Sequence, residues 1–202
     1  MRVGILAYQG GVAEHAFLVR KTLKELGLQG EVMPVKKPRQ LDGLHAIIIP
    51  GGESTTIGKL MHRFGLLEPL KQAIEDGLPV FGTCAGAIMM AKEVSDAVLG
   101  RIGQPLLAVM DIEVVRNYYG RQKDSFEVDV KIPALGGEPF RAIFIRAPAI
   151  IRAWGSATIL AEHEGVSVAA VQEHMLATTF HPELTGDTRI HRYFLEEIAT
   201  RA

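Results

Sequence analysis

Hydrophobic positions in the first half of the chain alternate between short apolar runs and stretches with a helical repeat. The apolar runs have the length and composition of buried strands in a parallel sheet, and they lie at 3–8, 31–35, 46–49 and 79–83. Apolar residues three or four positions apart predict helices over 12–26, 55–64, 67–76 and 85–94. This alternation predicts an α/β fold whose mostly parallel sheet is covered by helices on both faces.

The second half of the chain predicts shorter, β-rich elements. Turn signals separate several of them, and the expected strands lie at 112–115, 125–131, 142–145, 158–161, 167–171 and 177–180. A closing amphipathic helix is expected over 187–200, and its apolar face carries Ile190, Phe194, Leu195 and Ile198. The 202 residues contain no repeat, low-complexity tract or linker. We therefore expect residues 1–202 to form a single domain.

Composition and charge narrow the class of protein. Twenty-two basic and twenty-three acidic residues give a net charge of −1, which argues against nucleic acid or an anionic membrane as a general partner. The longest uncharged stretch, 77–91, is shorter than the ~20 apolar residues of a membrane-spanning helix, and the N-terminus has no secretory pattern. A single cysteine, Cys84, permits neither an intrachain disulfide nor a multi-cysteine zinc site. We expect a cytoplasmic protein without a metal.

Cys84 lies in the pentapeptide Gly82-Thr83-Cys84-Ala85-Gly86, between a predicted strand and a predicted helix. In the pattern Gly-x-nucleophile-x-Gly, a tight turn exposes the middle side chain above the sheet. The amino end of the following helix favours a thiolate there. The pentapeptide alone leaves two interpretations open, because buried cysteines also serve as small hydrophobic residues.

A general base for this cysteine is found in His181-Pro182-Glu183, at the end of an apolar run. In extended backbone, residues two apart project to the same side, so Glu183 could orient the imidazole of His181, which would take the thiol proton. Alternatively, the histidine caps a strand and the glutamate is solvated. The remaining histidines lack such surroundings and are expected on the surface or in the core; they are His15, His45, His62, His163, His174 and His191.

A glycine pair in Pro50-Gly51-Gly52-Glu53 follows the apolar run 46–49. Glycines there let backbone N–H groups approach a ligand closely, as an oxyanion hole requires. A phosphate-binding loop is disfavoured, because five residues separate Gly52 from Gly58 where that motif has four, and Leu60 stands where it has Ser or Thr. No histidines show the paired spacing of a metal site.

These motifs, in this order, resemble the class I glutamine amidotransferases and, more narrowly, the glutaminase subunits of pyridoxal 5′-phosphate synthases. The narrow resemblance extends over nearly the whole chain. Besides the motifs above, it rests on Gln9-Gly10-Gly11-Val12-Ala13-Glu14-His15, Ser54-Thr55-Thr56, Arg116-Asn117, Gly120-Arg121-Gln122, Asp124-Ser125-Phe126-Glu127, Phe144-Ile145-Arg146-Ala147-Pro148 and Leu184-Thr185. It implies a three-layer, flavodoxin-like fold and a glutaminase that requires no cofactor.

The resemblance also implies residue roles. Cys84 would attack the side-chain amide of L-glutamine, His181 would transfer the proton, and Glu183 would orient His181. Backbone groups of Gly52 and Ala85 would hold the oxyanion. The implied substrate contacts are Gly52, Glu53, Ser54, Arg116, Ile145 and Arg146. An arginine suits the α-carboxylate, because a guanidinium binds carboxylate through two parallel hydrogen bonds.

The implied partner is a (β/α)₈-barrel synthase subunit that consumes the ammonia within a hetero-oligomeric complex. The Gln9-Gly10 turn and the helix after it would form part of the docking surface, and docking would complete the oxyanion hole. The chain departs from the family pattern in two places, over 95–110 and at Tyr8. Neither departure involves Cys84, His181 or Glu183.

Two other functions remain open. The chain could be an independent cysteine hydrolase, such as a peptidase or γ-glutamyl hydrolase, on a similar flavodoxin-like sheet. It could also be a non-catalytic binding module that has kept the fold, although Cys84, His181 and Glu183 are all present.

Overall fold

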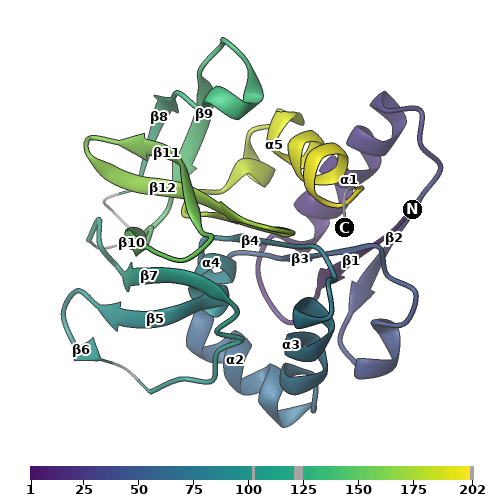
Figure 1. Ribbon diagram of the computed structural model, residues 1–202, viewed down its shortest axis with the longest axis horizontal. Coiled ribbons are helices and arrows are strands. Elements are labelled where there is room, and N and C mark those ends of the chain that lie inside the picture. Colours follow the sequence, from purple (N-terminus) through teal and green to yellow (C-terminus); the bar gives the residue numbers. More distant parts are fainter. Residues whose placement is uncertain (102, 121–124, 201–202) are drawn as a thin grey trace.

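The computed structural model describes residues 1–101, 103–120 and 125–200. Among them, eleven strands form one sheet in the order β2-β1-β3-β4-β13-β12-β10-β7-β5-β6, with β11 beside β12 (Figure 1). Its strands are β1 (Arg2–Leu6), β2 (Glu31–Val35), β3 (Ala46–Ile49), β4 (Val80–Thr83), β5 (Ala91–Asp96), β6 (Gly100–Arg101), β7 (Met110–Arg116), β10 (Ala149–Ala153), β11 (Thr158–His163), β12 (Val166–Gln172) and β13 (Met175–Thr178). A separate antiparallel pair comprises β8 (Phe126–Val130) and β9 (Phe140–Phe144). Arg121, Gln122 and Asp124, which carry part of the resemblance, lie outside the described residues.

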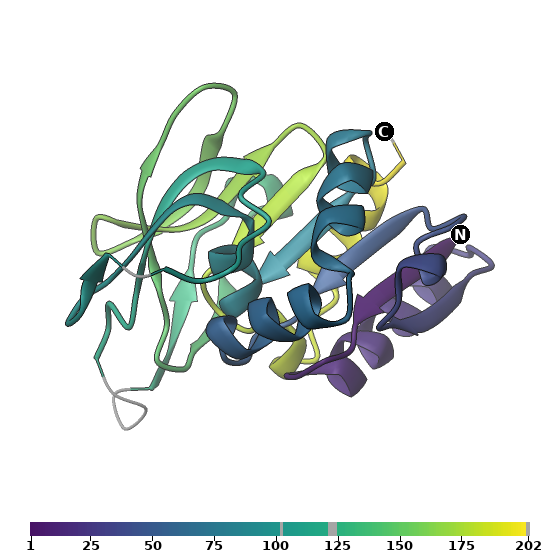
Figure 2. The same cartoon turned by 90° about the horizontal axis from the view of Figure 1, so that it is seen from below.

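Helices cover both faces of this sheet. They are α1 (Val12–Glu25), α2 (Ser54–Arg63), α3 (Leu67–Glu75), α4 (Ala85–Met90) and α5 (Arg189–Tyr193), which continues as a π-helical turn over Phe194–Ile198. In Figure 1, α1 and α5 lie above the parallel strands, and α2, α3 and α4 lie below them. The view from below shows α2 and α3 across these strands (Figure 2). The expected three-layer α/β fold is confirmed.

The continuous apolar run of β3 follows from burial on both sides. Ile47 and Ile49 pack into the core between the sheet and helices α2 and α3, whereas Ala46 and Ile48 pack into the core between the sheet and helices α1 and α5. All four side chains are fully buried, which explains the absence of any polar alternation. The parallel pairs extend from β2 through β1, β3 and β4 to β13, so the carboxyl ends of these strands share one edge.

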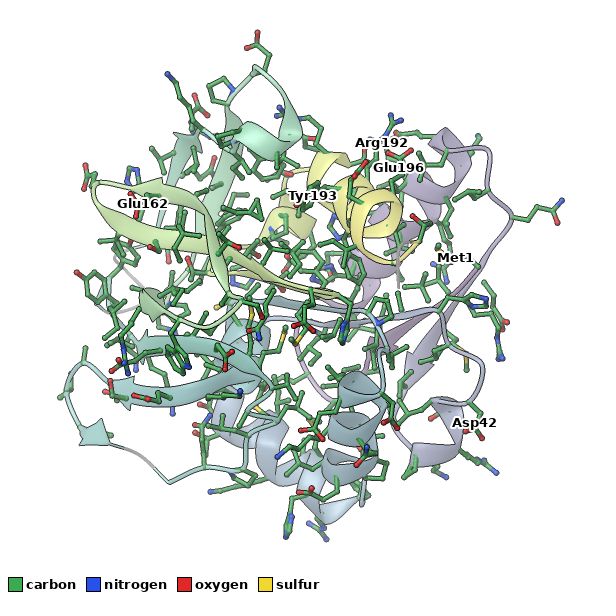
Figure 3. The ribbon with its side chains drawn as sticks, in the orientation of Figure 1. Met1, Asp42, Glu162, Arg192, Tyr193 and Glu196 are labelled. Atoms are coloured by element: carbon green, nitrogen blue, oxygen red, sulfur yellow. The ribbon has the colours of Figure 1, made fainter. Side chains whose placement is uncertain are left out.

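The closing helix presents the predicted apolar face. Ile190, Phe194, Leu195 and Ile198 are all buried. On the outer side, Arg192 and Glu196 are seen together in Figure 3, and Arg192 Nε lies 2.7 Å from Glu196 Oε2. None of the helices in the described part of the chain is long and apolar enough to span a bilayer.

One helix is shorter than its sequence predicts. The stretch 85–94 is helical only to Met90, and the chain then continues as β5, which pairs in parallel with β7. Strands β5, β6 and β10 have no clear sequence signal. In β5 the exposed residues Lys92 and Glu93 are adjacent, so the pattern does not alternate, and pairing with β7 decides the structure.

Candidate active site

Cys84 occupies the sharp turn between β4 and α4. Its backbone has φ of 50° and ψ of −103°, an unusual conformation for a residue with a side chain and one that clusters at functional sites. The Cys84 N–H donates to the carbonyl of Thr178 at 2.8 Å. Gly86 allows the helix to start this close to β3, because a Cβ at this position would collide with the carbonyl oxygen of Ile49. The expected strand-to-helix turn is therefore present.

His181 and Glu183 follow β13, the strand that pairs in parallel with β4. The His181 N–H donates to the carbonyl of Ile143 at 2.8 Å. Its Nδ1 lies 2.7 Å from Glu183 Oε1. The backbone differs from the expected extended form, because Pro182–Leu184 make a 3₁₀ turn, whose first position suits the fixed φ of proline.

Cys84 and Glu183 both favour the protonated form of His181. Burial opposes the charged imidazole, but hydrogen bonds to Cys84 and Glu183, together with their negative charges, raise the pKa of His181 to about 10. An imidazolium is thus the stable form at neutral pH, next to a cysteine that is only 7% exposed. A thiolate paired with an imidazolium is the nucleophilic form of such a pair.

A cavity of about 110 Å³ opens beside Cys84. It brings together all the residues that the resemblance assigns to substrate contact; it is lined by Gly52, Glu53, Ser54, Arg116, Ile145 and Arg146. Ile88, Asn117 and Pro148 complete the lining. Ala85 is the first residue of α4, so its N–H has no acceptor within the helix and is available to an oxyanion.

Glu53 forms an ion pair with Arg116 and caps the amino end of α2. The Glu53 carboxylate accepts from the N–H groups of Thr55 and Thr56 at the start of α2, and Arg116 Nη2 lies 3.0 Å from its Oε1. Burial alone would raise the pKa of Glu53, but these N–H groups and Arg116 hold it below its usual range. The carboxylate of Glu53 therefore stabilises the site by holding Arg116 and the start of α2 in place.

Gln104 is a further residue of this site. Its side-chain oxygen accepts from Arg116 Nη1 at 2.8 Å and from Thr55 Oγ1 at 2.9 Å. Gln104 comes from the segment 95–110, in which the chain departs from the family pattern and shows no helical or alternating repeat. No pattern in the sequence predicts this contact, because a loop residue meets Arg116 only through the folded arrangement of β5 and β7.

Arg146 is the second cation of the cavity. Its φ of 45° is also unusual for a residue with a side chain. In the described ranges, its guanidinium makes no hydrogen bond or ion pair, whereas Arg116 is paired with Glu53. The site thus combines a nucleophile, a base oriented by an acid, and a cation suited to a carboxylate. No cluster of side chains in the described part of the chain could hold a metal ion.

Tyr8, the second place where the chain departs from the family pattern, lies away from this cavity. The hydroxyl of Tyr8 donates to the carbonyl of Lys36 at 2.7 Å, and its ring stacks on Phe64 with centroids 5.7 Å apart. This pair borders a larger surface hollow of about 720 Å³, which contains neither Cys84 nor His181.

Comparison with known proteins identifies the family to which the chain belongs. Residues 5–200 match the model of the SNO glutamine amidotransferase family. The chain is 56% identical over 202 residues to the pyridoxal 5′-phosphate synthase subunit PdxT of Staphylothermus marinus, covering 98% of each chain. It is also 56% identical over 199 residues to the subunit of the same name from Aeropyrum pernix, covering 96% of this chain and 98% of the relative.

Solved structures agree with the sequence relatives. A crystal structure described as a glutamine amidotransferase superposes with a TM-score of 0.83 at 44% identity, covering 98% of both chains. A Thermotoga maritima glutamine amidotransferase superposes with a TM-score of 0.58 at 16% identity, covering 100% of this chain and 85% of that one. The second similarity supports the fold alone.

Proposed function

Because this chain belongs to the SNO glutamine amidotransferase family, we propose that its cavity binds L-glutamine with the side-chain amide next to Cys84. The enzyme is a glutaminase, the subunit of a pyridoxal 5′-phosphate synthase that releases ammonia for vitamin B6 biosynthesis. Relatives carrying that name are 52–56% identical over nearly the full length. The observation that carries the residue assignment is the hydrogen bond between His181 and Glu183, together with a cavity that is lined by both Cys84 and Arg146.

The reaction proceeds in two steps at Cys84. The thiolate attacks the amide carbon, and the backbone N–H groups of Gly52 and Ala85 stabilise the oxyanion. His181 gives its proton to the leaving nitrogen, the C–N bond breaks, and ammonia departs from a γ-glutamyl thioester. Water then adds to the thioester carbon as His181 takes its proton; the C–S bond breaks, and glutamate and the thiolate are restored. Glu183 orients the imidazole throughout.

Recognition of the substrate is divided between two arginines. Arg146 binds the α-carboxylate of glutamine, because it lines the cavity and, within the described ranges, no carboxylate is paired with its guanidinium, whereas Arg116 is paired with Glu53. Arg116, already paired with Glu53 and Gln104, keeps the wall of the cavity in place. Ser54 and the backbone of Gly52 and Ile145 supply the remaining polar contacts, and Glu53 contributes by holding Arg116.

The ammonia passes to a synthase subunit, for which we propose a (β/α)₈ barrel in a hetero-oligomeric complex. Gln9 Oε1 accepts the N–H of Glu53 at 3.0 Å, so a partner that binds the Gln9-Gly10 turn also acts on the adjacent oxyanion segment. We place the reaction in a reducing cytoplasm, because the nucleophilic thiol must stay unoxidised. The balanced charge of the chain gives no reason to include a membrane or nucleic acid among its partners.

The test is glutamate formation from glutamine, measured with and without the synthase subunit. The wild-type chain should turn over glutamine in the complex, and Cys84→Ala should abolish turnover while still binding the synthase and unfolding at the wild-type temperature. An exposed substitution, His62→Gln, serves as the matched control. Turnover that persists in Cys84→Ala would contradict the assigned nucleophile, and turnover of peptides or esters without the synthase would favour an independent hydrolase.

A further inference from the structure

The two oxygens of Glu183 have different surroundings. Oε1 faces His181, whereas Oε2 lies 3.4 Å from His15 Nε2. Within the described residues, Oε2 has no hydrogen-bond partner that meets normal geometry, so the imidazole of His15 is placed to supply one only at long range. The Glu183 side chain is 1% exposed and that of His15 is fully buried, so water cannot replace the imidazole. The reaction described above makes no use of His15.

The amino end of α1 places His15 in this position. The His15 N–H donates to the carbonyl of Gly11 at 3.0 Å. The turn before α1 packs directly on the acid, because a Cβ at Gly11 would lie 3.0 Å from Glu183 Oε1. His15 therefore approaches the carboxylate from a different element than the one that carries His181.

The same imidazole nitrogen contacts the strand of the nucleophile. His15 Nε2 lies 3.2 Å from Thr83 Oγ1, and Thr83 Oγ1 accepts the N–H of Gly51 at 3.1 Å. Thr83 precedes Cys84 in the chain, and Gly51 precedes Gly52. One buried side chain thus contacts the acid and, through a hydroxyl, the segment that carries an oxyanion donor.

Hydrogen-bond acceptors determine which ring nitrogens carry protons. An ionised carboxylate can only accept, so the nitrogen of His15 that faces Glu183 must be Nε2–H. His15 Nδ1 is then an acceptor, and His191 Nε2, 2.9 Å away, must be the donor. His191 Nδ1 remains as a lone pair without a partner in the described structure, and an unfilled acceptor is a less unusual defect in a core than an unpaired N–H.

Both buried imidazoles are neutral. Burial holds the pKa of His15 well below its usual range, and repulsion from the nearby imidazolium of His181 acts in the same direction. Burial lowers the pKa of His191 to about 3, against a smaller opposite effect of Asp187. A neutral donor can fix the carboxylate without cancelling its charge, so the negative charge of Glu183 remains to support the imidazolium of His181.

We propose that His15 is a positioning residue for the glutaminase reaction, because its Nε2–H faces Glu183 Oε2 and Thr83 Oγ1 from a buried position behind the acid. It fixes the carboxylate that orients His181, and His191 fixes its tautomer. The inference rests on the proposed function. It assigns a role to His15, for which the sequence predicted only a position on the surface or in the core.

The test compares three substitutions of His15 in the complex with the synthase subunit. His15→Gln can place an N–H near the position of Nε2, His15→Asn extends only as far as Nδ1, and His15→Leu removes the donor. We expect His15→Leu and His15→Asn to lower kcat, by at most the roughly 10- to 100-fold that loss of a hydrogen bond to a charged group would cause, because the contact at 3.4 Å is longer than such a bond. KM should stay within about twofold, because His15 does not line the cavity, and His15→Gln should recover most of kcat.

Several outcomes decide between positioning and packing. A wild-type kcat in His15→Leu would overturn the proposal, as would equal losses in His15→Gln and His15→Asn. If His15→Leu fails to fold, the two amide variants still carry the comparison, with thermal unfolding measured for both. A wild-type complex without glutaminase activity would instead refute the proposed function, so the two failures are distinguishable.

Discussion

Acid should destabilise this protein through His191 before its carboxylates become protonated. The imidazole is fully buried, and its pKa of about 3 in the folded chain compares with ~6.5 in an unfolded chain. Between these values the unfolded state binds the additional proton, so stability is present above pH ~6.5 and is lost as the pH falls toward 3. From pH 7.5 to pH 5 this linkage amounts to about 2 kcal/mol for His191 alone.

The substitution His191→Gln isolates this contribution, because glutamine can still donate an N–H toward His15 Nδ1 but does not titrate. The measurement is the free energy of unfolding in urea at pH 7.5, 6.5, 5.5 and 5. Between the extremes, the wild-type chain should lose about 2 kcal/mol more than His191→Gln. The exposed His62→Gln should follow the wild type.

Other histidines do not obscure the comparison. His181, whose pKa is raised to about 10, has the opposite sign: its contribution is complete below pH ~6.5 and is lost as the pH rises toward 10. This contribution is present in all three chains and cancels in their differences. Parallel pH dependence in the wild type and His191→Gln would refute the buried, neutral state of His191.

Three further predictions concern the site. Glu183→Gln should lower kcat roughly 10²- to 10⁴-fold, and it should move the alkaline loss of activity to lower pH, because the negative charge of Glu183 helps to raise the pKa of His181; a pH–rate profile in the complex measures both. Arg146→Met should raise KM for glutamine at least tenfold with a smaller change in kcat, and steady-state kinetics that show the reverse would contradict its role in binding. Gly58→Ala should lower the free energy of unfolding by roughly 1–3 kcal/mol and raise KM, because a Cβ there would collide with the carbonyl of Pro105 next to Gln104. The control is Gly103→Ala, whose added Cβ would meet nothing within 4 Å. It should leave thermal unfolding and KM unchanged.

The parallel half of the fold could be predicted because its elements carry strong local signals. The run 46–49 becomes a strand with the same bounds, since burial on both faces leaves no position for a polar residue. The helix over 85–94 was wrong beyond Met90, because pairing with β7 overrides the helical preference of that stretch. Short antiparallel strands such as β10 depend on their neighbours in the sheet for their stability, so single-sequence patterns miss them.

The candidate site shows the same division. Cys84 could be found because a strand-to-helix turn imposes its own local sequence, and His181 and Glu183 because they are two residues apart. His15 and Gln104 could not be found, since each contributes through partners far along the chain: His15 contacts Glu183, and Gln104 contacts Arg116. Such contacts are determined by packing, and they leave no periodic pattern in the sequence.

The site is built from two sets of elements with different tasks. The chemical groups lie at the carboxyl ends of adjacent parallel strands: Gly52 follows β3, Cys84 follows β4, and His181 follows β13. Pairing among these strands holds Cys84, His181 and the proposed oxyanion segment together, and α1 packs behind them. The proposed recognition residues, Arg116 and Arg146, lie at the end of β7 and after β9, in the mixed and antiparallel part of the fold. Substitutions that loosen the second set should therefore act mainly on KM, and those that loosen the first mainly on kcat, because the first set carries the reacting groups and the second the proposed substrate contacts.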